Sequence, residues 1–329
     1  MKKIGILTSG GDAPGMNAAI WAAVKRARSY DMTVLGVQDG YRGLLERRVE
    51  DLTNRDLSDI MHRGGTFLGT ARCLEMLTEE GRSRAVHNIH DYGIEGLIVI
   101  GGDGSFRGAE ILSERGVPTV GLPGTIDNDL AYTDYSIGFD TACNTAIGEI
   151  MKIKDTMTSH DRVAVIEVMG RHCGDIALTV SLAVAADYVL LPEVSYETEY
   201  DIDNLSHFLL NIKKQGRDSS LIIMAEGVNW NEKNRAEILM NRLTERTGLD
   251  IRATVLGHTQ RGGPPSAFDS RIAILMGVRA VELLKEGMGN RVVGIIENRI
   301  VDINIKQALD MPPRFNEELY GMARMLSLS

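Results

Sequence analysis

Two aspartate-containing segments could carry the chemistry of this chain of 329 residues. The first, GGDGS at Gly101 to Ser105, follows the apolar run LIVI and precedes a helical pattern. Its glycines allow backbone N–H groups to approach phosphate oxygens closely, with the positive end of a helix dipole behind them. The pattern therefore predicts a phosphate-binding loop, and the alternative is a tight strand-to-helix turn with Asp103 as the N-cap.

The second segment, PGTIDND at Pro123 to Asp129, places Asp127 and Asp129 two residues apart, beside a hydroxyl and an amide. Two carboxylates so close raise the cost of each other's ionisation, so they need a cation or a proton-sharing role. The spacing and closing glutamate of an EF-hand are missing. A base that accepts a hydroxyl proton, beside a magnesium-binding aspartate, fits phosphoryl transfer better. An Asx-turn without a catalytic role is the alternative.

Arginines at or near the glycine-rich loops supply the countercharge, namely Arg72, Arg162, Arg171, Arg252 and Arg261. A guanidinium fork matches phosphate oxygens bidentately, whereas lysine acts as a point charge. A single arginine is more often part of a surface salt bridge, but five beside such loops favour binding of at least two anionic groups. His258, in the run GHTQRGG, could hydrogen-bond a sugar or a phosphate, or be structural.

The elements that must position these groups are strands that end in polar loops. Short β-branched runs alternate with amphipathic stretches, which is typical of parallel strands joined by crossover helices. Six strands end in LTSGGDAPG, VIGGDGS, LPGTIDND, VMGRHCGD, MAEG and LGHTQRGG. Ligands of an open parallel sheet bind beyond the carboxyl ends of its strands, so we expect these loops to face one cleft.

The predicted boundaries follow from the same patterns. Strands are expected near residues 2–8, 33–38, 96–100, 118–122, 162–168, 188–191, 220–225, 251–256 and 291–296. Helices are expected near residues 17–30, 79–92, 105–115, 141–159, 202–215, 233–247 and 270–285.

Composition excludes several other classes of protein. The formal net charge of -9 repels nucleic acid and anionic membranes, so no partner of either kind is expected. No apolar run approaches the roughly 20 residues of a membrane span and no signal h-region is present, so we expect a cytoplasmic protein. The three cysteines are too few for a disulfide framework or a four-ligand zinc site. The motifs GxxxxGK[ST], GxGxxG, GxSxG, HExxH and CxxC are all missing.

Eight segments, in order, resemble those of the bacterial ATP-dependent 6-phosphofructokinase family: SGGDAPGMNAAI, HRGGTFLGTAR, VIGGDGS, GLPGTIDND, SIGFDTA, VIEVMGRHCGD, AEGV and VLGHTQRGG. The resemblance implies two Rossmann-like α/β/α domains with mainly parallel sheets and an active site in the cleft between them. Residues 1–139 plus about 260–310 would bind ATP, and about 140–259 plus 311–329 would bind fructose 6-phosphate. The implied reaction, the committing step of glycolysis, transfers the γ-phosphoryl of MgATP to the 1-hydroxyl of fructose 6-phosphate.

The resemblance also implies roles for individual residues. ATP would be held by Gly11, Tyr41, Arg72, Cys73, Gly102, Asp103, Gly104 and Ser105, with Asp103 on Mg²⁺. The reacting hydroxyl would lie among Thr125, Ile126, Asp127 and Asp129, with Asp127 as base and Arg171 stabilising the transferring group. The sugar would contact Met169, Gly170, Glu226, His258, Thr259 and Gln260, and its phosphate Arg162, Arg252 and Arg261. In this family the first two of these arginines reach across from a neighbouring subunit, which implies a homotetramer.

Two glycines bear on the phosphoryl donor. Pyrophosphate-dependent members of the family typically carry Asp at the position of Gly104 and Lys at that of Gly124. A carboxylate at position 104 would repel the α-phosphate of ATP, so glycine at both positions favours ATP. The alternatives that stay open are pyrophosphate-dependent transfer, another kinase that shares only the GGDG loop, such as a lipid or NAD kinase, and a catalytically silent nucleotide sensor. Cys73 is expected to be a spectator against adenine, with a reactive thiol as the alternative.

The family also binds ADP and phosphoenolpyruvate at a regulatory site between subunits, and here the corresponding positions are Trp21, Lys25, Asp59, Lys154, Ala185, Asp187, Gln215, Arg217 and Asp218. Trp21 and Lys154 replace the usual arginines, and Asp187 the usual glutamate. Loss of a bidentate fork and gain of carboxylates weaken binding of a polyanion. We therefore predict a weak or absent response to these effectors. The alternative is that Trp21 packs at a subunit interface while Lys25, Lys154 and Arg217 retain a modest site.

Overall fold

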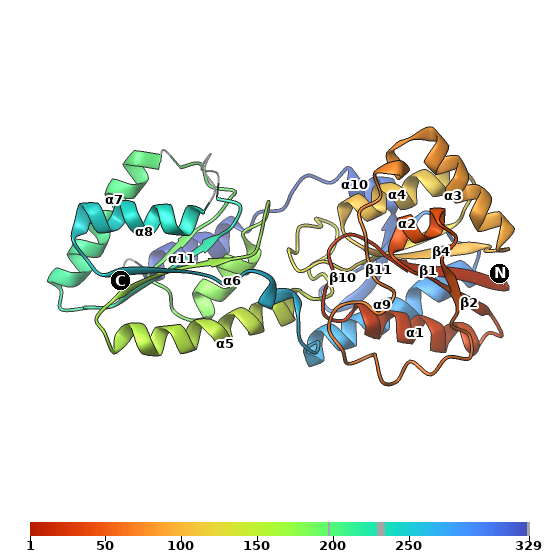
Figure 1. Ribbon diagram of the computed structural model, residues 1–329, viewed down its shortest axis with the longest axis horizontal. Helices are drawn as coiled ribbons and strands as arrows, with labels where there is room; N and C mark the ends of the chain where they lie inside the picture. The colour runs from red at the N-terminus through yellow and green to blue at the C-terminus, as the bar shows by residue number, and fades with distance from the viewer. Residues whose placement is uncertain (197, 229–233, 328–329) are drawn as a thin grey trace. The chain divides into compact units, whose positions relative to one another are not determined.

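The computed structural model describes residues 1–196, 198–228 and 234–327, and the chain divides into two compact units. Unit 1 comprises Met1–Thr141 and Arg261–Pro313, and unit 2 comprises Ala142–Gln260 and Arg314–Ser329. Each unit is a sheet covered by helices on both faces (Figure 1). No helix within the described ranges is long and apolar enough to cross a membrane.

Unit 1 contains a seven-stranded sheet in the order β11-β10-β5-β4-β1-β2-β3. The strands are β1 (Lys3–Thr8), β2 (Thr33–Val37), β3 (Val49–Asp51), β4 (Gly96–Gly101), β5 (Thr119–Pro123), β10 (Arg291–Ile296) and β11 (Arg299–Asn304). Only the edge strands β3 and β11 pair antiparallel with their neighbours. Every residue of β4 is buried, as expected for a central parallel strand with helices on both faces.

The helices of unit 1 are α1 (Met16–Arg28), α2 (Gly40–Leu45), α3 (Glu79–Asp91), α4 (Asp103–Glu114), α9 (Ala267–Lys285) and α10 (Ile305–Leu309). The short 3₁₀ helix η1 (Leu74–Leu77) also belongs to unit 1, whereas η2 (Gly257–Arg261) spans the boundary, with Gln260 in unit 2 and Arg261 in unit 1. Figure 1 shows α1 and α9 on one face of the sheet and α2, α3, α4 and α10 on the other. The core on this second face contains Phe106 and Leu112 of α4, packed with strand residues such as Val99.

Unit 2 contains a four-stranded parallel sheet in the order β7-β8-β6-β9. Its elements are β6 (Val163–Val168), β7 (Tyr188–Leu190), β8 (Ser220–Ala225), β9 (Ile251–Val255), α5 (Phe139–Thr158), α6 (Asp175–Ala183), α7 (Thr198–Lys214), α8 (Arg235–Thr247) and α11 (Glu317–Ser327). Helices α7 and α8 cover one face, and α5 and α6 lie on the other (Figure 1). Leu239 and Leu243 of α8 pack there on Val163 and Val165 of β6.

A buried carboxylate fixes the start of α5. Asp269, in the first turn of α9, is fully buried and accepts hydrogen bonds from Gly138 N at 3.0 Å, Thr141 N at 2.7 Å and Thr141 Oγ1 at 2.5 Å. Burial raises the pKa of Asp269 to about 6. Its carboxyl group therefore caps the helix that carries the chain from unit 1 into unit 2.

The predicted α/β fold class is confirmed, and all nine predicted strands and seven predicted helices are present, β8 and β10 with the predicted ends and the others with shifted ends. Predicted helix 233–247 begins at Arg235, and residue 233 itself lies outside the described residues. The sequence analysis missed β3, β11, α2, α6, α10 and α11. The segment DIALTVSLA of α6 is apolar on most sides, so its helical period is weak.

Candidate active site

Three loops of unit 1 emerge from one edge of its sheet. Strands β5, β4 and β1 are adjacent and parallel, so the loops after their carboxyl ends are neighbours. Ser9 N donates to Ile100 O at 2.9 Å, and Gly124 N donates to Gly101 O at 3.0 Å. The strand order reverses between β4 and β1, where ligands of open α/β sheets bind. The structure thus brings both predicted aspartate loops to the expected edge.

The turn from β4 into α4 is built on glycine. A Cβ atom on Gly101 would lie 2.4 Å from Ser9 O, so a larger residue does not fit. Gly102 is the N-cap of α4 and Asp103 is the first helical residue, so the alternative reading of Asp103 as the N-cap is wrong. Arg107 Nε donates to Asp103 Oδ2 at 2.9 Å. The sequence analysis missed Arg107, which the i,i+4 spacing would have indicated.

The loop from Gly124 to Asp129 is held by Asn128 and Ser136. Asn128 has a φ of 54°, a left-handed conformation that asparagine tolerates, and its Oδ1 accepts from Ser136 N at 2.9 Å. Ser136 Oγ donates to Thr125 O at 2.7 Å. Asn128 therefore provides the Asx-type contacts that fix the loop, with Asp127 half-buried and Asp129 exposed. Ile126, between Thr125 and Asp127, is fully buried and anchors the loop to the unit.

Tyr41 and Ser105 are largely buried rather than open to a ligand. Tyr41 is 5% exposed, and its hydroxyl donates to Ser105 O at 2.6 Å. Burial raises the pKa of Tyr41. Its ring lies against Gly108, where an added Cβ would be 2.8 Å away. The tyrosine therefore fixes the first turn of α4, and Cys73 packs against the same core.

Arg72 is exposed just before Cys73, and two apolar side chains follow it on the surface. Leu74 is 75% exposed and Leu77 is 70% exposed. These side chains give the segment after Arg72 an apolar, accessible face, which suits a flat aromatic base.

Arg261, the last residue of η2, contacts the loop after β1. Its Nη1 donates to Asp12 O at 3.1 Å, and a Cβ atom on Gly11 would lie 2.6 Å from that nitrogen. Glycine at position 11 therefore makes room for the guanidinium. Both residues belong to unit 1.

Unit 2 presents a second set of loops at the carboxyl edge of its own sheet. Met169 N donates to the fully buried Gln260 Oε1 at 3.2 Å, and Glu226 N donates to Val168 O at 2.8 Å. Gly170 has a φ of 126°, and a Cβ there would lie 2.5 Å from Cys173 O. His258 and Thr259 are exposed beside these strand ends. Gln260 is thus a support for the Met169 backbone.

A cavity of about 860 Å³ opens in unit 2, lined by Glu167, Arg171, His172, Pro192, Glu226, Gly227, Asn234 and Arg235. Arg171 and Glu226 were predicted. Glu167, His172 and Arg235 were not, although a glutamate within the apolar run VAVIEV is an unusual polar interruption that could have drawn attention to the strand end.

Arg162 and Arg252 lie away from these loops, and their grouping with the other arginines was wrong. Arg162 directly precedes β6, and Arg252 is the second residue of β9, so both are at amino ends of strands. They share Asp250, with Nε to carboxylate distances of 2.7 and 3.1 Å. The hydrogen bond from Arg162 holds the pKa of Asp250 below its usual range. Within one chain, these two arginines and Arg171 stand at opposite edges of the unit 2 sheet.

A second cavity of unit 2, about 180 Å³, contains four predicted effector positions, Lys154, Ala185, Asp187 and Arg217. Asp187, 8% exposed, accepts a hydrogen bond from Arg217 and another from Leu221 N at 2.8 Å. Lys154 Nζ donates to Val184 O at 2.8 Å. Both cations of this cavity are therefore engaged by groups of the protein. Gln215 and Asp218 are exposed, and Trp21, Lys25 and Asp59 belong to unit 1.

The residues of unit 1 fit a magnesium ion bound with a nucleotide. Within the described part of the chain no group of three or more His, Cys, Asp or Glu side chains could hold a metal. Magnesium that binds together with a nucleotide is held by one or two carboxylates, together with waters and the substrate phosphates. Asp103, at the start of a helix that follows a glycine turn, offers one carboxylate beside a place for phosphates.

Glycine turns that cradle phosphates, with carboxylates on the adjacent strand end, define an α/β phosphotransferase. The chain belongs to the phosphofructokinase family, which it matches over residues 3–284. It is 53% identical over 327 residues to the ATP-dependent 6-phosphofructokinase of Clostridium acetobutylicum, covering 99% of this chain and 100% of that protein. It is 54% identical over 331 residues to that of Clostridioides difficile, with 100% of both chains covered. The family resemblance inferred from the sequence is confirmed.

A solved structure of phosphofructokinase from Saccharomyces cerevisiae is similar in fold. The TM-score is 0.87 at 34% sequence identity, and the match covers 100% of this chain. It covers 47% of the yeast chain, so this chain spans about half the length of that relative.

Proposed function

We propose that the protein is an ATP-dependent 6-phosphofructokinase, which transfers the γ-phosphoryl of MgATP to the 1-hydroxyl of fructose 6-phosphate. The products are fructose 1,6-bisphosphate and ADP. The observation that carries the proposal is the meeting of two aspartate loops at the ends of β4 and β5, joined by the 3.0 Å hydrogen bond from Gly124 N to Gly101 O. Two relatives that match the whole chain and bear this name support the substrates.

The nucleotide is bound by unit 1. Backbone N–H groups at Gly102 and Gly104 and the dipole of α4 attract its phosphates. Gly11 and Arg72 extend the site, with the adenine near Cys73. Tyr41 and Ser105 contribute mainly by fixing α4, because both are largely buried. Asp103 would hold Mg²⁺, and the ion would supply positive charge beside the phosphates.

The chemistry depends on a carboxylate that accepts the proton of the sugar hydroxyl. Asp127 is the base, since the loop that carries it is rigidly held by Asn128 and Ser136. Thr125 and Asp129 orient the hydroxyl from the same loop. Arg171 stabilises the negative charge of the phosphoryl group as it is transferred. An alcohol is a poor nucleophile, and such a base contributes roughly 10² to 10⁴ in rate.

The sugar phosphate is bound mainly by unit 2. Glu226 lines the cavity of about 860 Å³, and Met169 and Gly170 form the adjacent strand end. His258 and Thr259 are accessible for hydrogen bonds to the substrate. Arg261 contributes from the end of η2, where its guanidinium donates to Asp12 O of the loop after β1.

Arg162 and Arg252 are the basis for proposing a homotetramer. They stand at the amino ends of their strands, at the edge opposite Arg171, so they do not serve the sugar cavity of their own chain. A neighbouring subunit would present them to its partner's sugar phosphate. Mixing an Arg252→Ala variant with an Arg171→Ala variant should restore activity through hybrid tetramers, and mixtures without recovery would contradict this assembly.

We expect the protein to act in the cytoplasm.

Regulation by phosphoenolpyruvate or ADP is weak or absent. Arg217, the cation best suited to bind a phosphate in the 180 Å³ cavity, is already paired with the buried Asp187. Lys154 is engaged with a carbonyl oxygen. An effector would have to break both contacts, which lowers its net affinity.

A single assay tests the proposed function. The purified chain is incubated with MgATP and fructose 6-phosphate, and ADP and fructose 1,6-bisphosphate are measured. Pyrophosphate replaces ATP in a parallel sample. We expect turnover with ATP and little with pyrophosphate. Comparable rates with both would overturn the donor assignment, and no product with either would support the nucleotide-sensor alternative.

A further inference from the structure

The loop between β6 and α6 carries the arginine that is proposed to act on the phosphoryl group. It runs from Met169 to Gly174, and its residues Arg171 and His172 are exposed and line the cavity of about 860 Å³. An exposed arginine side chain has many accessible rotamers, so the place of its guanidinium depends on the backbone that bears it. The contacts that fix this backbone therefore determine where the positive charge lies.

The first half of the loop is fixed by neighbouring segments of unit 2. Met169 N donates to Gln260 Oε1 at 3.2 Å, and Gly227 N donates to Gly170 O at 3.2 Å. The carbonyl oxygen of Arg171 lies directly against Gly227, where an added Cβ would be only 1.8 Å away. Glycine is therefore required at position 227, and the loop is closely packed on the segment after β8 as far as Arg171.

The second half of the loop is fixed by Glu193, in the turn after β7. Gly174 N donates to Glu193 Oε1 at 2.7 Å, and an added Cβ on Gly174 would lie 2.8 Å from Glu193 Oε2. Glycine at position 174 therefore lets the carboxylate approach closely. Gly174 is the N-cap of α6, and in a capping box a glutamate at the third helical position accepts from the N–H of that residue. Here the third position is Ala177, so Glu193 provides the acceptor from another element.

Burial of the Glu193 carboxylate costs free energy. The residue is half-buried, and its Oε2 atom is buried without a hydrogen-bond partner among the described residues. Burial also raises the pKa of Glu193. Helix α6 is anchored by other contacts, since Ile176, Ala177 and Leu178 are at most 1% exposed. A serine or asparagine cap would stabilise the start of α6 without burying a charge, so the loop explains Glu193 better than the helix does.

We propose that Glu193 is a positioning residue for phosphoryl transfer: its carboxylate fixes the loop at Gly174, and the loop presents Arg171 to the transferring group. The inference rests on the proposed function, because it deepens the same site. Without the acceptor of Glu193, the loop is held only at its first half, and the guanidinium of Arg171 is less well placed. The loss should appear in the chemical step and not in the binding of the sugar.

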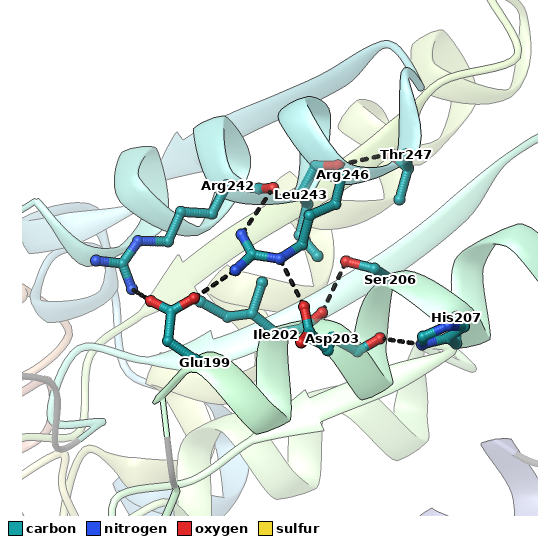
Figure 2. A network of polar contacts seen from close by, with 9 residues as sticks. All are labelled: Glu199, Ile202, Asp203, Ser206, His207, Arg242, Leu243, Arg246 and Thr247. Atoms are coloured by element: carbon teal, nitrogen blue, oxygen red, sulfur yellow. Dashed lines mark hydrogen bonds and ion pairs between the residues drawn. The ribbon is translucent and has the colours of Figure 1, made fainter.

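Unit 2 offers a matched control in the helix that follows Glu193. Figure 2 shows Glu199 and Asp203 of α7 facing Arg242 and Arg246 of α8. The Arg242 Nη1 to Glu199 Oε1 distance is 3.2 Å, and Arg246 Nε lies 2.7 Å from Asp203 Oδ1. None of these four residues lines the cavity of about 860 Å³. Glu199→Gln therefore removes a paired carboxylate of the same unit without changing a contact of the Arg171 loop.

The kinetic test compares Glu193→Met, which removes the acceptor, with Glu193→Gln, whose amide oxygen still accepts from Gly174 N. Glu193→Met should lower kcat about 10-fold with the KM for fructose 6-phosphate within about threefold, because a misplaced group is lost mainly from the transition state. Glu193→Gln should recover kcat to within about threefold of the wild type, and Glu199→Gln should leave it unchanged. In an Arg171→Met background, Glu193→Met should lower kcat no further, since it acts through Arg171.

Hydrogen exchange measures the hold on the loop without catalysis. Amide exchange of peptides that cover residues 169–178 is followed by mass spectrometry in the same variants. Glu193→Met should exchange faster than the wild type in the loop and at the start of α6, because the Gly174 amide has lost its acceptor. Glu193→Gln and Glu199→Gln should exchange as the wild type does in these peptides.

Three outcomes would overturn the inference: a further loss of kcat from Glu193→Met in the Arg171→Met background, a rise in KM at unchanged kcat, or equal exchange of the loop in wild type and Glu193→Met. If Glu193→Met does not fold, Glu193→Asp, whose shorter side chain does not reach Gly174 N, takes its place in both measurements. If the wild type shows no turnover, the proposed function fails, and the exchange measurement alone decides whether Glu193 holds the loop.

Discussion

Replacement of Gly104 by aspartate should separate nucleotide binding from folding. Gly104 is exposed in the first turn of α4, and an added Cβ would meet no atom within 4 Å. The fold therefore accepts a side chain there. An acidic residue in the first helical turn stabilises a helix by about 0.3 to 1 kcal/mol, and removal of glycine reduces the entropy cost of helix formation. We expect a Tm for Gly104→Asp no lower than that of the wild type.

Gly104→Asp should weaken ATP binding although it does not destabilise the fold, because the new carboxylate would lie beside the loop that binds the phosphates. Two unit charges roughly 6 Å apart, at an effective dielectric constant of about 20, repel by about 3 kcal/mol. Position 104 is exposed, so we take solvent screening to leave about half of this energy. A loss of about 1.5 kcal/mol corresponds to a rise in the KM for ATP of roughly 10-fold.

The assay measures the KM for MgATP and for fructose 6-phosphate in Gly104→Asp and in its neutral isostere Gly104→Asn. The asparagine variant has the same shape without the charge, so its KM for ATP should stay within about threefold of the wild type. The KM for fructose 6-phosphate should be unchanged in both. Equal KM values for ATP in the two variants would refute the electrostatic reasoning, because shape alone would then explain the change.

Three further predictions concern single carboxylates. Asp127→Ser should lower kcat by at least about 100-fold at nearly unchanged substrate affinity, and near-normal turnover would remove Asp127 from the mechanism. The wild type should respond little to phosphoenolpyruvate, whereas Asp187→Asn, which frees Arg217, should gain inhibition; strong sigmoidal inhibition of the wild type at submillimolar concentration would contradict this. For Asp269, the pKa is raised from 3.8 to about 6, so the folded state favours the protonated carboxyl group. The stability that this residue contributes is therefore fully present below pH 3.8 and is lost as pH rises through about 6. The difference in unfolding free energy between wild type and Asp269→Asn, measured by chemical denaturation, should therefore fall by about 3 kcal/mol from pH 4 to 7, and a constant difference would rule out this titration.

Much of the fold could be predicted because the core strands are recognisable from their own apolar residues. Runs such as LIVI in β4 are apolar throughout, since helices cover both faces of the sheet. The missed strands β3 and β11 lie at the sheet edges, where residues such as Asp51 and Asp302 are compatible with exposure and weaken the pattern. In unit 1 the edge strands were therefore the ones missed, whereas the edge strands β7 and β9 of unit 2 were predicted from their apolar and β-branched residues.

The candidate site also contains features that the sequence could predict and features that it could not. The glycine-rich loops follow the strands after which they were expected: Gly101 is required by the close approach of Ser9 O, and Asn128 adopts a left-handed conformation that asparagine tolerates. The arginines were predicted less well. Their type indicates anion binding, but the predicted strands 162–168 and 251–256 already placed Arg162 and Arg252 at amino ends of strands, at the edge opposite to Arg171, so grouping them with the loops overlooked strand direction.

Contacts between residues from different elements could not be predicted from the sequence pattern. Arg235 of α8 donates to the carbonyl oxygen of Glu226, just after β8, and nothing in the local sequence of either residue specifies the other. The same holds for Asp187 and Arg217, whose pairing cancels one of the two positive charges, Lys154 and Arg217, that line the cavity. A count of basic residues at the effector positions would have overestimated the affinity of that cavity for anions. The charge that a ligand meets is the charge left after the protein's own pairs are made, so residue type alone could predict which site exists but not how strongly it binds.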